Sequence, residues 1–360
     1  MSKTYHIIPI FVPHRGCPHD CVFCNQRKIT GLSTEITDKD VDDTIKEYLK
    51  TIPKSNKKLE VAFFGGSFTG IDIKVQKELL DVAKEYKEKG LIDNIRLSTR
   101  PDYIDKEILD ILKGKKVDTI ELGVQSLDKD VLEKSNRGHT MEDVINASNL
   151  IKRYGFNLGL QMMVGLPGDT VEKSINTAKQ IISLSPDFVR IYPTLVVKDT
   201  HLENMYLDRN YKSLTLEEGV FVSSILLMLF KVNDIGVIRI GLQPTDNISL
   251  NKDLVAGPFH PSFRQMVESE LYRIVIDKFM SENTITNDII IEVNNSIVSN
   301  IIGQKKKNKS YLKKKYNIKN FKINGTNIPR DYMAFYNNNK YNKININKYI
   351  YDYLKEKNII

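Results

Sequence analysis

Three cysteines lie within eight residues of one another near the start of the chain. Cys17, Cys21 and Cys24 are the only cysteines among 360 residues. Three thiolates spaced four and three residues apart on one loop can hold three corners of a cubane iron–sulfur cluster. Because there is no fourth cysteine, one metal position would stay open for a ligand, as a catalytic metal site requires.

A zinc site is the alternative for the same loop. His19 lies between the cysteines and would supply a fourth ligand. A structural zinc site, however, normally draws ligand pairs from two separated segments, and this chain has no second pair. An odd number of clustered cysteines is also a poor disulfide framework and fits a reducing compartment. The spacing therefore favours the cluster.

Further motifs with chemical potential follow the apolar runs of the chain. They are Phe63-Phe64-Gly65-Gly66-Ser67-Phe68, Glu121-Leu122-Gly123-Val124-Gln125-Ser126 with Arg137 beyond it, and Gly165-Leu166-Pro167-Gly168. Two adjacent glycines let a backbone approach a ligand closely. The planar guanidinium of an arginine can bind a carboxylate through two hydrogen bonds. Taken singly, the glycine pair also fits an ordinary turn and the arginine a helix cap.

The elements that must position these motifs alternate between strands and helices. The predicted strands are His6–Val12, Leu59–Phe64, Asn94–Ser98, Thr119–Val124, Asn157–Val164, Phe188–Pro193 and Gly236–Leu242. The predicted helices are Asp38–Thr51, Ile73–Lys89, Lys106–Lys113, Asp128–Leu132, Met141–Tyr154, Thr170–Leu184 and Thr215–Asn233. This alternation predicts an α/β fold, a partial (β/α)6 TIM-like barrel whose strands present the motifs at their carboxyl ends.

The cysteine motif, with an aromatic residue before its last cysteine, resembles the signature of the radical S-adenosylmethionine (SAM) superfamily. This resemblance implies one 4Fe-4S cluster on Cys17, Cys21 and Cys24, with SAM bound at the open iron. It also implies reductive cleavage of SAM to a 5′-deoxyadenosyl radical, with electrons from a reductant such as flavodoxin or ferredoxin.

The superfamily uses a glycine pair after the second strand to bind SAM, and the Glu121–Ser126 string with Arg137 is similar to that of the oxygen-independent coproporphyrinogen oxidase group. These resemblances imply a set of SAM contacts, namely Gly65, Gly66, Ser67, Ser98, Gln125 and Arg137. Ser98 stands where the family often has an acidic residue toward the SAM ribose. The ribose contact is therefore expected to be weaker here, because a serine hydroxyl binds a ribose hydroxyl less strongly than a side-chain carboxylate would.

A narrower resemblance covers roughly Lys3 to Asp208. Four strings together resemble the radical SAM domain of the Elongator catalytic subunit, a tRNA-modifying enzyme: Thr99-Arg100-Pro101-Asp102-Tyr103, Glu121–Ser126, Arg137-Gly138-His139-Thr140 and Ile191–Val197. No glycine-rich acetyl-CoA loop follows, and the cysteine spacing is shorter than in that subunit. The acetyl-CoA-dependent chemistry is therefore not carried over to this chain.

The last third of the chain carries the excess positive charge. Ala256 to Ile360 contains 18 basic and 9 acidic residues, whereas Met1 to Val255 contains 35 and 36. We expect a radical SAM catalytic domain over residues 1–255 and a small basic α+β domain over residues 256–360. Its strand, helix, Gly303-Gln304-Lys305-Lys306, helix, strand order is similar to the core of a KH domain, a fold that grips single-stranded nucleic acid.

This similarity predicts an RNA-binding patch that contacts phosphates. Its residues are Lys305, Lys306, Lys307, Lys313 and Lys314. A small capping domain with a solvated lysine-rich helix is the simpler alternative. No apolar run reaches the length of a membrane span and no signal peptide opens the chain, so a cytoplasmic location without membrane contact is expected.

Three hypotheses about function follow. In the first, the chain is a radical SAM enzyme that modifies tRNA. In the second, it is a radical SAM oxidoreductase acting on a small molecule such as a porphyrin precursor. In the third, it is an RNA-binding module that keeps a metal knuckle without catalysis. The glycine pair, Gln125 and Arg137 argue against the third, because a binding module would not need SAM contacts.

Overall fold

The computed structural model divides the chain into two compact units. Unit 1 comprises residues 1–213 and 243–257, and unit 2 comprises residues 214–242 and 258–360. The structure describes residues 5–12, 21–25, 36–52, 58–242, 252–285, 288–337 and 340–360. Among the described helices, none is both long and apolar enough to cross a membrane.

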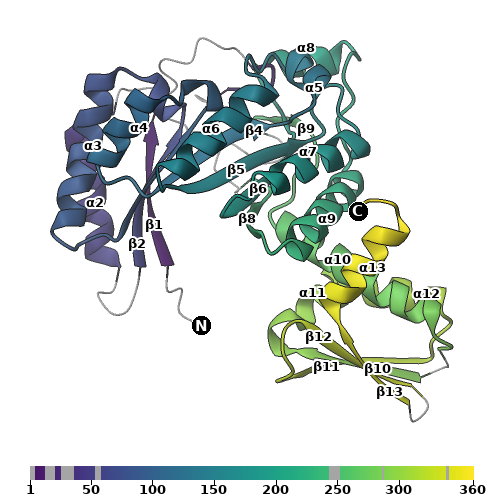
Figure 1. Ribbon diagram of the computed structural model, residues 1–360. Coiled ribbons are helices and arrows are strands. Elements are labelled where there is room, and N and C mark those ends of the chain that lie inside the picture. Colours follow the sequence, from purple (N-terminus) through teal and green to yellow (C-terminus); the bar gives the residue numbers. More distant parts are fainter. Residues whose placement is uncertain are drawn as a thin grey trace. The chain divides into compact units, whose positions relative to one another are not determined.

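A curled sheet forms the centre of unit 1 (Figure 1). Within unit 1 the strand order is β1-β2-β3-β4-β5-β6, and successive strands pair in parallel. The strands are β1 (Tyr5–Val12), β2 (Lys58–Gly65), β3 (Asn94–Thr99), β4 (Thr119–Gln125), β5 (Asn157–Val164) and β6 (Phe188–Pro193), while β8 (Gly236–Ile240) belongs to unit 2. A separate pair is formed by β7 (Val196–Val197) and β9 (Leu254–Ala256). The predicted α/β half-barrel is confirmed.

Helices connect the parallel strands and cover one face of the sheet (Figure 1). They are α2 (Asp38–Thr51), α3 (Ile73–Glu88), α4 (Lys106–Gly114), α5 (Lys129–Lys134), α6 (Met141–Arg153) and α7 (Val171–Ser183); a further helix, α8 (His201–Leu207), follows β7. Threonine side chains mark several of their starts. Thr37 and Thr140 each form a capping box with an aspartate three residues on, and Thr170 accepts a hydrogen bond from the Lys173 amide. Such caps satisfy amides that the helix itself leaves without partners.

The two faces of this sheet differ sharply in chemistry. Successive side chains of a strand point to opposite faces. The face covered by helices is apolar and fully buried, and includes Val61, Phe63, Ile95, Leu97, Ile120, Leu122, Leu158, Leu160, Val189 and Ile191. The strand register places a polar set on the other, inner face, namely Glu60, Arg96, Ser98, Glu121, Gln161, Arg190 and Tyr192. Burial of the apolar face holds the helices in place, so the inner face remains for chemistry.

Unit 2 is an α+β body with its own sheet. The strands β11 (Asn320–Thr326), β10 (Asp288–Asn294), β12 (Tyr332–Asn337) and β13 (Lys340–Asn345) lie in that order, and only the β10–β11 pair is parallel. The helices are α9 (Leu216–Val232), α10 (Phe263–Glu282), α11 (Val298–Ile302), α12 (Lys307–Lys315) and α13 (Ile346–Glu356). Phe279 of α10 stacks on Phe335 of β12 with ring centroids 3.8 Å apart. Helix α10 therefore packs against one face of the sheet (Figure 1).

Candidate functional site

The glycine pair at the end of β2 is locked against the end of β1. Gly65 pairs with Val12, and the Gly66 amide donates to the Val12 carbonyl at 3.0 Å. Gly65 has φ +109°, and a Cβ added there would lie 2.5 Å from the Val12 carbonyl oxygen. Only glycine fits this position without strain. The turn therefore exposes backbone at the carboxyl edge of the sheet, next to the strand from which the cysteine segment departs.

The described part of the cysteine segment, residues 21–25, is anchored by its backbone. The Val22 amide donates to the Ser135 carbonyl at 3.1 Å, and the Val22 carbonyl accepts from the Leu202 amide at 2.7 Å. Cys21 is buried, and Cys24 is partly accessible. Cys17 and His19 lie outside the described residues. Two of the three predicted ligands are therefore fixed beside the carboxyl edge of the sheet.

The aromatic residue of the cysteine motif has a packing role. Phe23 packs against a buried cluster formed by Val22, Val196, Leu202 and Tyr211. The Tyr211 hydroxyl donates to the Gly165 carbonyl at 2.6 Å. Burial raises the pKa of Tyr211 above its ordinary value, so the hydroxyl remains protonated and able to donate. The cluster thus ties the cysteine segment to the loop that follows β5.

Arg137 reaches this segment from the end of α5. Its amide donates to the Leu132 carbonyl at 3.0 Å, while Asn136 adopts a left-handed φ of +49°, so the helix ends in a Schellman-type turn. The side chain then turns inward. Its Nη2 donates to the Gly123 carbonyl at 2.6 Å, and its Nη1 lies 3.5 Å from the Cys21 Sγ. The backbone of Arg137 completes the helix end, and its guanidinium faces the site.

The charge of Arg137 is not balanced by any described carboxylate. The side chain is 7% exposed, forms no ion pair with the described residues, and its Nε has no hydrogen-bond partner among them. A buried cation without a counter-ion is strongly unfavourable. The position therefore fits an anionic group, and a bidentate guanidinium suits a carboxylate. SAM carries such a carboxylate, so the residues present fit the group that the sequence motifs imply.

Gln125 joins β4 to β5 at the same edge. It has a left-handed φ of +67° next to an irregularity in the β4–β5 register. Its Oε1 accepts a hydrogen bond of 2.7 Å from the Gln161 Nε2. Gln161 was not predicted from the sequence, although it lies on the strand that the Gly165 motif closes. Ser98 lies on the inner face beside Glu121, half-buried, as a ribose contact would require.

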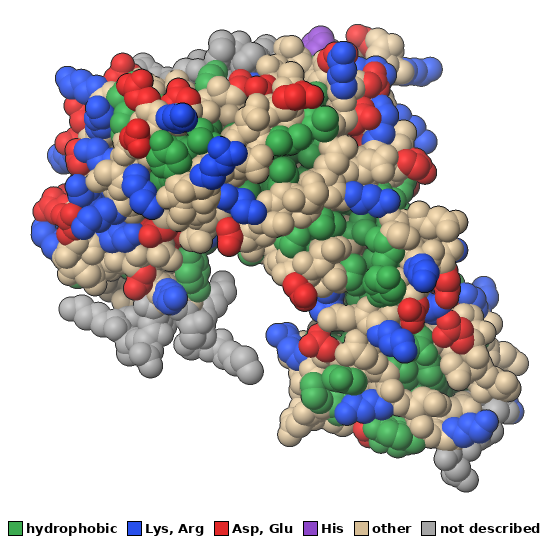
Figure 2. Space-filling model, viewed as in Figure 1, with side chains coloured by type: hydrophobic (Ala, Val, Ile, Leu, Met, Phe, Trp, Pro, Cys, Tyr) green, Lys and Arg blue, Asp and Glu red, His purple; other side chains and the backbone are tan. Residues whose placement is uncertain are grey.

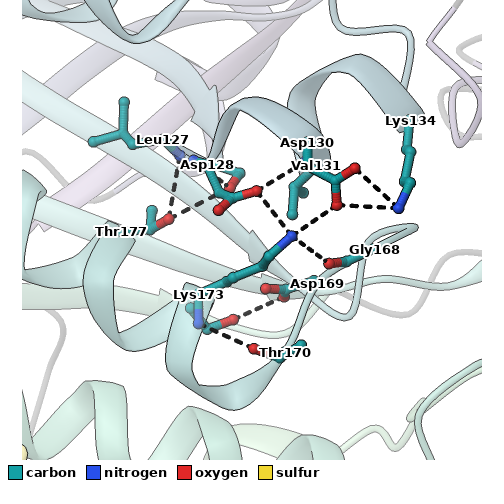
Figure 3. A network of polar contacts seen from close by, with 12 residues as sticks. Leu127, Asp128, Asp130, Val131, Lys134, Gly168, Asp169, Thr170, Lys173 and Thr177 are labelled. Carbon is teal, nitrogen blue, oxygen red and sulfur yellow. Dashed lines mark hydrogen bonds and ion pairs between the residues drawn. The ribbon is translucent and has the colours of Figure 1, made fainter.

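A network around Lys173 fixes the loops that follow β4 and β5 (Figure 3). The Lys173 ammonium lies 3.0 Å from Asp128, 2.7 Å from Asp130 and 3.0 Å from the Gly168 carbonyl. Asp169 accepts hydrogen bonds of 2.8 Å from the Gly165 amide and the Ser174 hydroxyl. Burial raises the pKa of the Asp169 carboxyl, and these donors only partly offset that effect. The loop that follows β4 and the loop that follows β5 are therefore tied to each other through Lys173.

A chain of buried ion pairs crosses the inner face, and the sequence reading missed it. Arg96 lies 2.8 Å from Glu60 and 3.6 Å from Glu121, and Arg190 lies 2.7 Å from Glu121. All four side chains are buried. Burial raises the pKa of the Glu60 carboxyl, against the opposing effect of the Arg96 guanidinium. The sequence does carry a signal for these ion pairs. Each charged residue lies inside an otherwise apolar strand, two positions from a polar or small residue, so the two share one face of the strand.

Gly123 offers a direct test of this arrangement. A Cβ added there would lie 3.0 Å from both the Arg137 Nη2 and the Gln125 Nε2. Gly123→Ala is expected to displace both side chains and to weaken SAM binding about tenfold, because 1.4 kcal/mol of lost interaction corresponds to a factor of ten. The measurement is anaerobic equilibrium dialysis of SAM with the reconstituted protein.

The matched control for this variant is Gly114→Ala at the end of α4. A Cβ there meets nothing within 4 Å, and Gly114 is not in the left-handed region. The control should bind SAM as the wild type does and gain slightly in thermal stability. Equal SAM affinity of Gly123→Ala and the control would contradict the assignment of Arg137 and Gln125 to the SAM site.

The predicted RNA-binding lysines lie in unit 2, with Lys305, Lys306 and Lys307 at the start of α12 and Lys313 and Lys314 in its last turn. Lys305 and Lys306 have left-handed φ values of +48° and +63°. The side chains of Lys305, Lys306, Lys307, Lys313 and Lys314 are exposed. Lys307 lies 3.6 Å from Glu217, whereas Lys315 is paired with Asp277 at 2.8 Å. The α12 amides have no side-chain cap. Positive side chains beside the amino-terminal, positive end of a helix are unfavourable, and a bound anion would offset this repulsion.

The geometry defines a class of protein. A parallel half-barrel has its buried thiol, its glycine turn and a guanidinium without a carboxylate partner among the described residues at the carboxyl edge, where such folds bind ligands. Comparison with known families refines this. Residues 11–181 match the model of the Radical SAM superfamily, and residues 186–273 match that of the Radical_SAM C-terminal domain. The chain belongs to the radical SAM superfamily and is an enzyme of that superfamily.

Individual relatives agree with the narrower resemblance. The chain is 34% identical over 222 residues to an uncharacterized protein of Methanocaldococcus jannaschii, covering 58% of this chain and 66% of the relative. It is 33% identical over 199 residues to the tRNA uridine(34) acetyltransferase of Methanocaldococcus infernus, covering 49% and 37%. The archaeal Methanocaldococcus infernus Elp3 shares the fold, with a TM-score of 0.58, 22% identity and coverage of 78% and 63%.

The chain therefore spans less than two thirds of the length of each of these relatives. The predicted resemblance to the radical SAM domain of Elongator-type proteins is confirmed. The activity of the longer relatives is not thereby assigned to this chain.

Acidic and basic side chains are interspersed over the helix-covered face of unit 1 seen in Figure 2, so the basic excess is not concentrated there.

Proposed function

We propose that this chain is a radical SAM enzyme that modifies tRNA. The observation that carries the proposal is the buried Arg137 guanidinium, which has no described carboxylate partner and lies 3.5 Å from the Cys21 thiol. An anion-binding group beside a cluster ligand is what SAM bound at an open iron would need. Membership of the superfamily supports the same cofactors.

The roles of the individual residues follow from their positions. Cys17, Cys21 and Cys24 would hold one 4Fe-4S cluster. Arg137 would bind the SAM carboxylate, and Ser98 would contact the ribose. Backbone and side-chain contacts would come from the remaining predicted residues, namely Gly65, Gly66, Ser67 and Gln125. When bound and reduced, the cofactors would supply a 5′-deoxyadenosyl radical for hydrogen abstraction. A reductant of the flavodoxin or ferredoxin type would deliver the electron.

The tRNA substrate is supported by the relatives and by unit 2. The similarity to a tRNA uridine(34) acetyltransferase extends over 199 residues of this chain. In unit 2, β10 and β11 are parallel neighbours separated by α11 and α12, with the basic turn at Lys305 and Lys306 between the helices. Uncapped helix amides and exposed lysines provide contacts to phosphates without reading sequence. We propose residues 1–255 as the catalytic domain and residues 256–360 as an RNA-binding, KH-like domain.

The proposal is tested by product formation. The reconstituted protein is incubated anaerobically with SAM and dithionite, with and without bulk tRNA from cells lacking the enzyme. We expect 5′-deoxyadenosine formation to rise when tRNA is added. Slow formation that is indifferent to tRNA but rises with a porphyrin precursor would favour the small-molecule alternative. No formation from protein with a confirmed cluster would favour the binding-module alternative.

A charge-reversal variant tests the RNA site. Lys305→Glu combined with Lys306→Glu should weaken tRNA binding at low salt and flatten the plot of log affinity against log salt by roughly one to two units, because about two phosphate contacts are lost. Lys307 is left unchanged because it lies 3.6 Å from Glu217. Filter binding of labelled tRNA over a range of salt concentrations provides the measurement.

The matched control reverses two exposed lysines of unit 1, Lys77→Glu with Lys179→Glu. This control changes the net charge equally, so it separates a local site from a general charge effect. Identical salt slopes for the two double variants would refute the lysine patch. RNA-independent 5′-deoxyadenosine formation should be unchanged in both.

A further inference from the structure

Tyr192 lies at the carboxyl end of β6 on the inner face of the sheet. It is the register partner of Met163, follows Arg190 by two residues and is partly accessible. Its hydroxyl accepts a hydrogen bond of 3.3 Å from the Arg190 Nη1. None of the predicted cluster or SAM contacts includes this tyrosine. Tyr192 therefore lies on a part of the inner face to which no cofactor contact is assigned.

Arg190 is held rigidly beneath this tyrosine. Its Nε forms an ion pair of 2.7 Å with Glu121, and its guanidinium lies 5.4 Å from the centre of the Phe64 ring. Both charged side chains are buried, with exposed fractions of 7% and 5%. A buried, paired and stacked guanidinium has few alternative positions. Arg190 consequently holds the Tyr192 hydroxyl in one orientation.

The donors and acceptors of Arg190 and Tyr192 decide which further hydrogen bond the Tyr192 hydroxyl can form. A guanidinium has only donors, so the phenolic hydrogen cannot return to Arg190. No hydrogen bond from the Tyr192 hydroxyl to another described residue is present, and the Tyr192 side chain is only partly buried. The Tyr192 hydroxyl can therefore donate a hydrogen bond to a bound ligand. The adjacent positive charge strengthens that donor through polarisation of the hydroxyl.

We propose that Tyr192 is a substrate-binding residue that donates a hydrogen bond to a carbonyl oxygen of the nucleobase being modified. Arg190 and Glu121 are the positioning residues that hold it. This inference rests on the proposed function, because it takes the substrate to be a base of tRNA. A site that donates to a carbonyl discriminates against bases that present an amino group there, since two donors would then face each other.

The test compares Tyr192→Phe with the wild type and with Tyr154→Phe. The control removes a phenolic hydroxyl beside α6, where Tyr154 interacts with Asp110, away from the inner face. For Tyr192→Phe we expect the tRNA-dependent part of 5′-deoxyadenosine formation to fall about tenfold, as expected for one lost hydrogen bond. RNA-independent formation, tRNA affinity and melting temperature should stay unchanged, which a merely structural role would not predict.

The outcomes separate this inference from the proposed function. A wild type that does not respond to tRNA overturns both. A responsive wild type with an equally responsive Tyr192→Phe variant overturns the inference alone. A loss of tRNA response in Tyr154→Phe that equals the loss in Tyr192→Phe also overturns it, because the effect would then not belong to the inner face.

A double-mutant cycle tests the positioning role of Arg190. Arg190→Lys keeps a cation beside Glu121 but loses the fork that reaches Tyr192. It should lower the tRNA response in the wild-type background and add no further loss in the Tyr192→Phe background, because coupled residues are not additive. Equal further loss in both backgrounds would show that Arg190 does not act through Tyr192.

Discussion

Replacing Cys21 with alanine is expected to abolish both the iron–sulfur absorption and the cleavage of SAM. Cys21 is buried, its segment is anchored at Ser135 and Leu202, and its Sγ lies 3.5 Å from the Arg137 guanidinium. No other cysteine exists outside the motif to replace it. Loss of one of three thiolates leaves the cluster without enough ligands. Visible absorption, iron content and 5′-deoxyadenosine formation after anaerobic reconstitution measure the effect.

The matched control for Cys21→Ala is His19→Ala, which separates cluster from zinc. If the three cysteines hold a cluster alone, His19→Ala keeps the brown colour and SAM cleavage. If the loop is a zinc site, both variants lose zinc and neither is coloured. A Cys21→Ala protein that retains colour and SAM cleavage would refute the assignment of this thiol as a ligand.

Replacing Arg137 with alanine should lower SAM affinity about 100-fold while leaving the cluster in place. The guanidinium is buried and lacks a described carboxylate partner, so a bound carboxylate would satisfy it. Loss of a buried, charge-assisted contact of this kind costs about 3 kcal/mol, which is a factor of about 100. Equilibrium dialysis of SAM and the visible spectrum of the cluster, on the same samples, provide the two readouts.

The control for this variant is Arg153→Ala, an exposed arginine in the last turn of α6. It removes the same charge from the surface and should leave SAM affinity unchanged. Arg137→Lys should bind SAM with intermediate affinity, because a lysine keeps the charge without the bidentate fork. Unchanged SAM affinity of Arg137→Ala would mean that the carboxylate is held elsewhere.

The parallel strands of unit 1 and the helices between them could be predicted from local pattern alone, whereas β7, β9 and α8 were not predicted. Asn157–Val164 was predicted with the bounds that β5 has, and Asp38–Thr51 with those of α2. Both have strong periodicity and clear boundaries, with the capping threonine Thr37 before the helix. Such signals are contained within a dozen residues, so they survive without knowledge of tertiary structure.

The carboxyl-terminal elements could not be predicted in the same way. The stretch from Tyr336 to Ile360 is rich in Asn, Lys, Tyr and Ile and shows no clear local pattern, yet it contains all of β13 and all of α13. In β13 only Ile344 is buried, so the strand shows no alternation of apolar and polar residues. Its place in the sheet is fixed by pairing with β12, which a local reading of the sequence cannot see.

The site was predicted to the extent that its residues lie in contiguous motifs. Arg137 and Gln125 could be found because short strings mark them, and the structure brings Arg137 to Cys21 across 116 residues of sequence. Gln161 and the ion pairs of the inner face depend on the register of neighbouring strands. Arg96 and Glu60, for example, meet only because β2 and β3 pair in one particular register.

The charged residues of the inner face also bear on how the sheet assembles. Because strand side chains alternate, a slip of β3 by one residue would move Arg96 to the apolar face and bring Ile95 and Leu97 inward. An unpaired guanidinium would then be buried among aliphatic side chains, at a cost of several kcal/mol. The ion pairs therefore favour the native register of these parallel strands over a one-residue slip, because only the native alignment pairs Arg96 with Glu60.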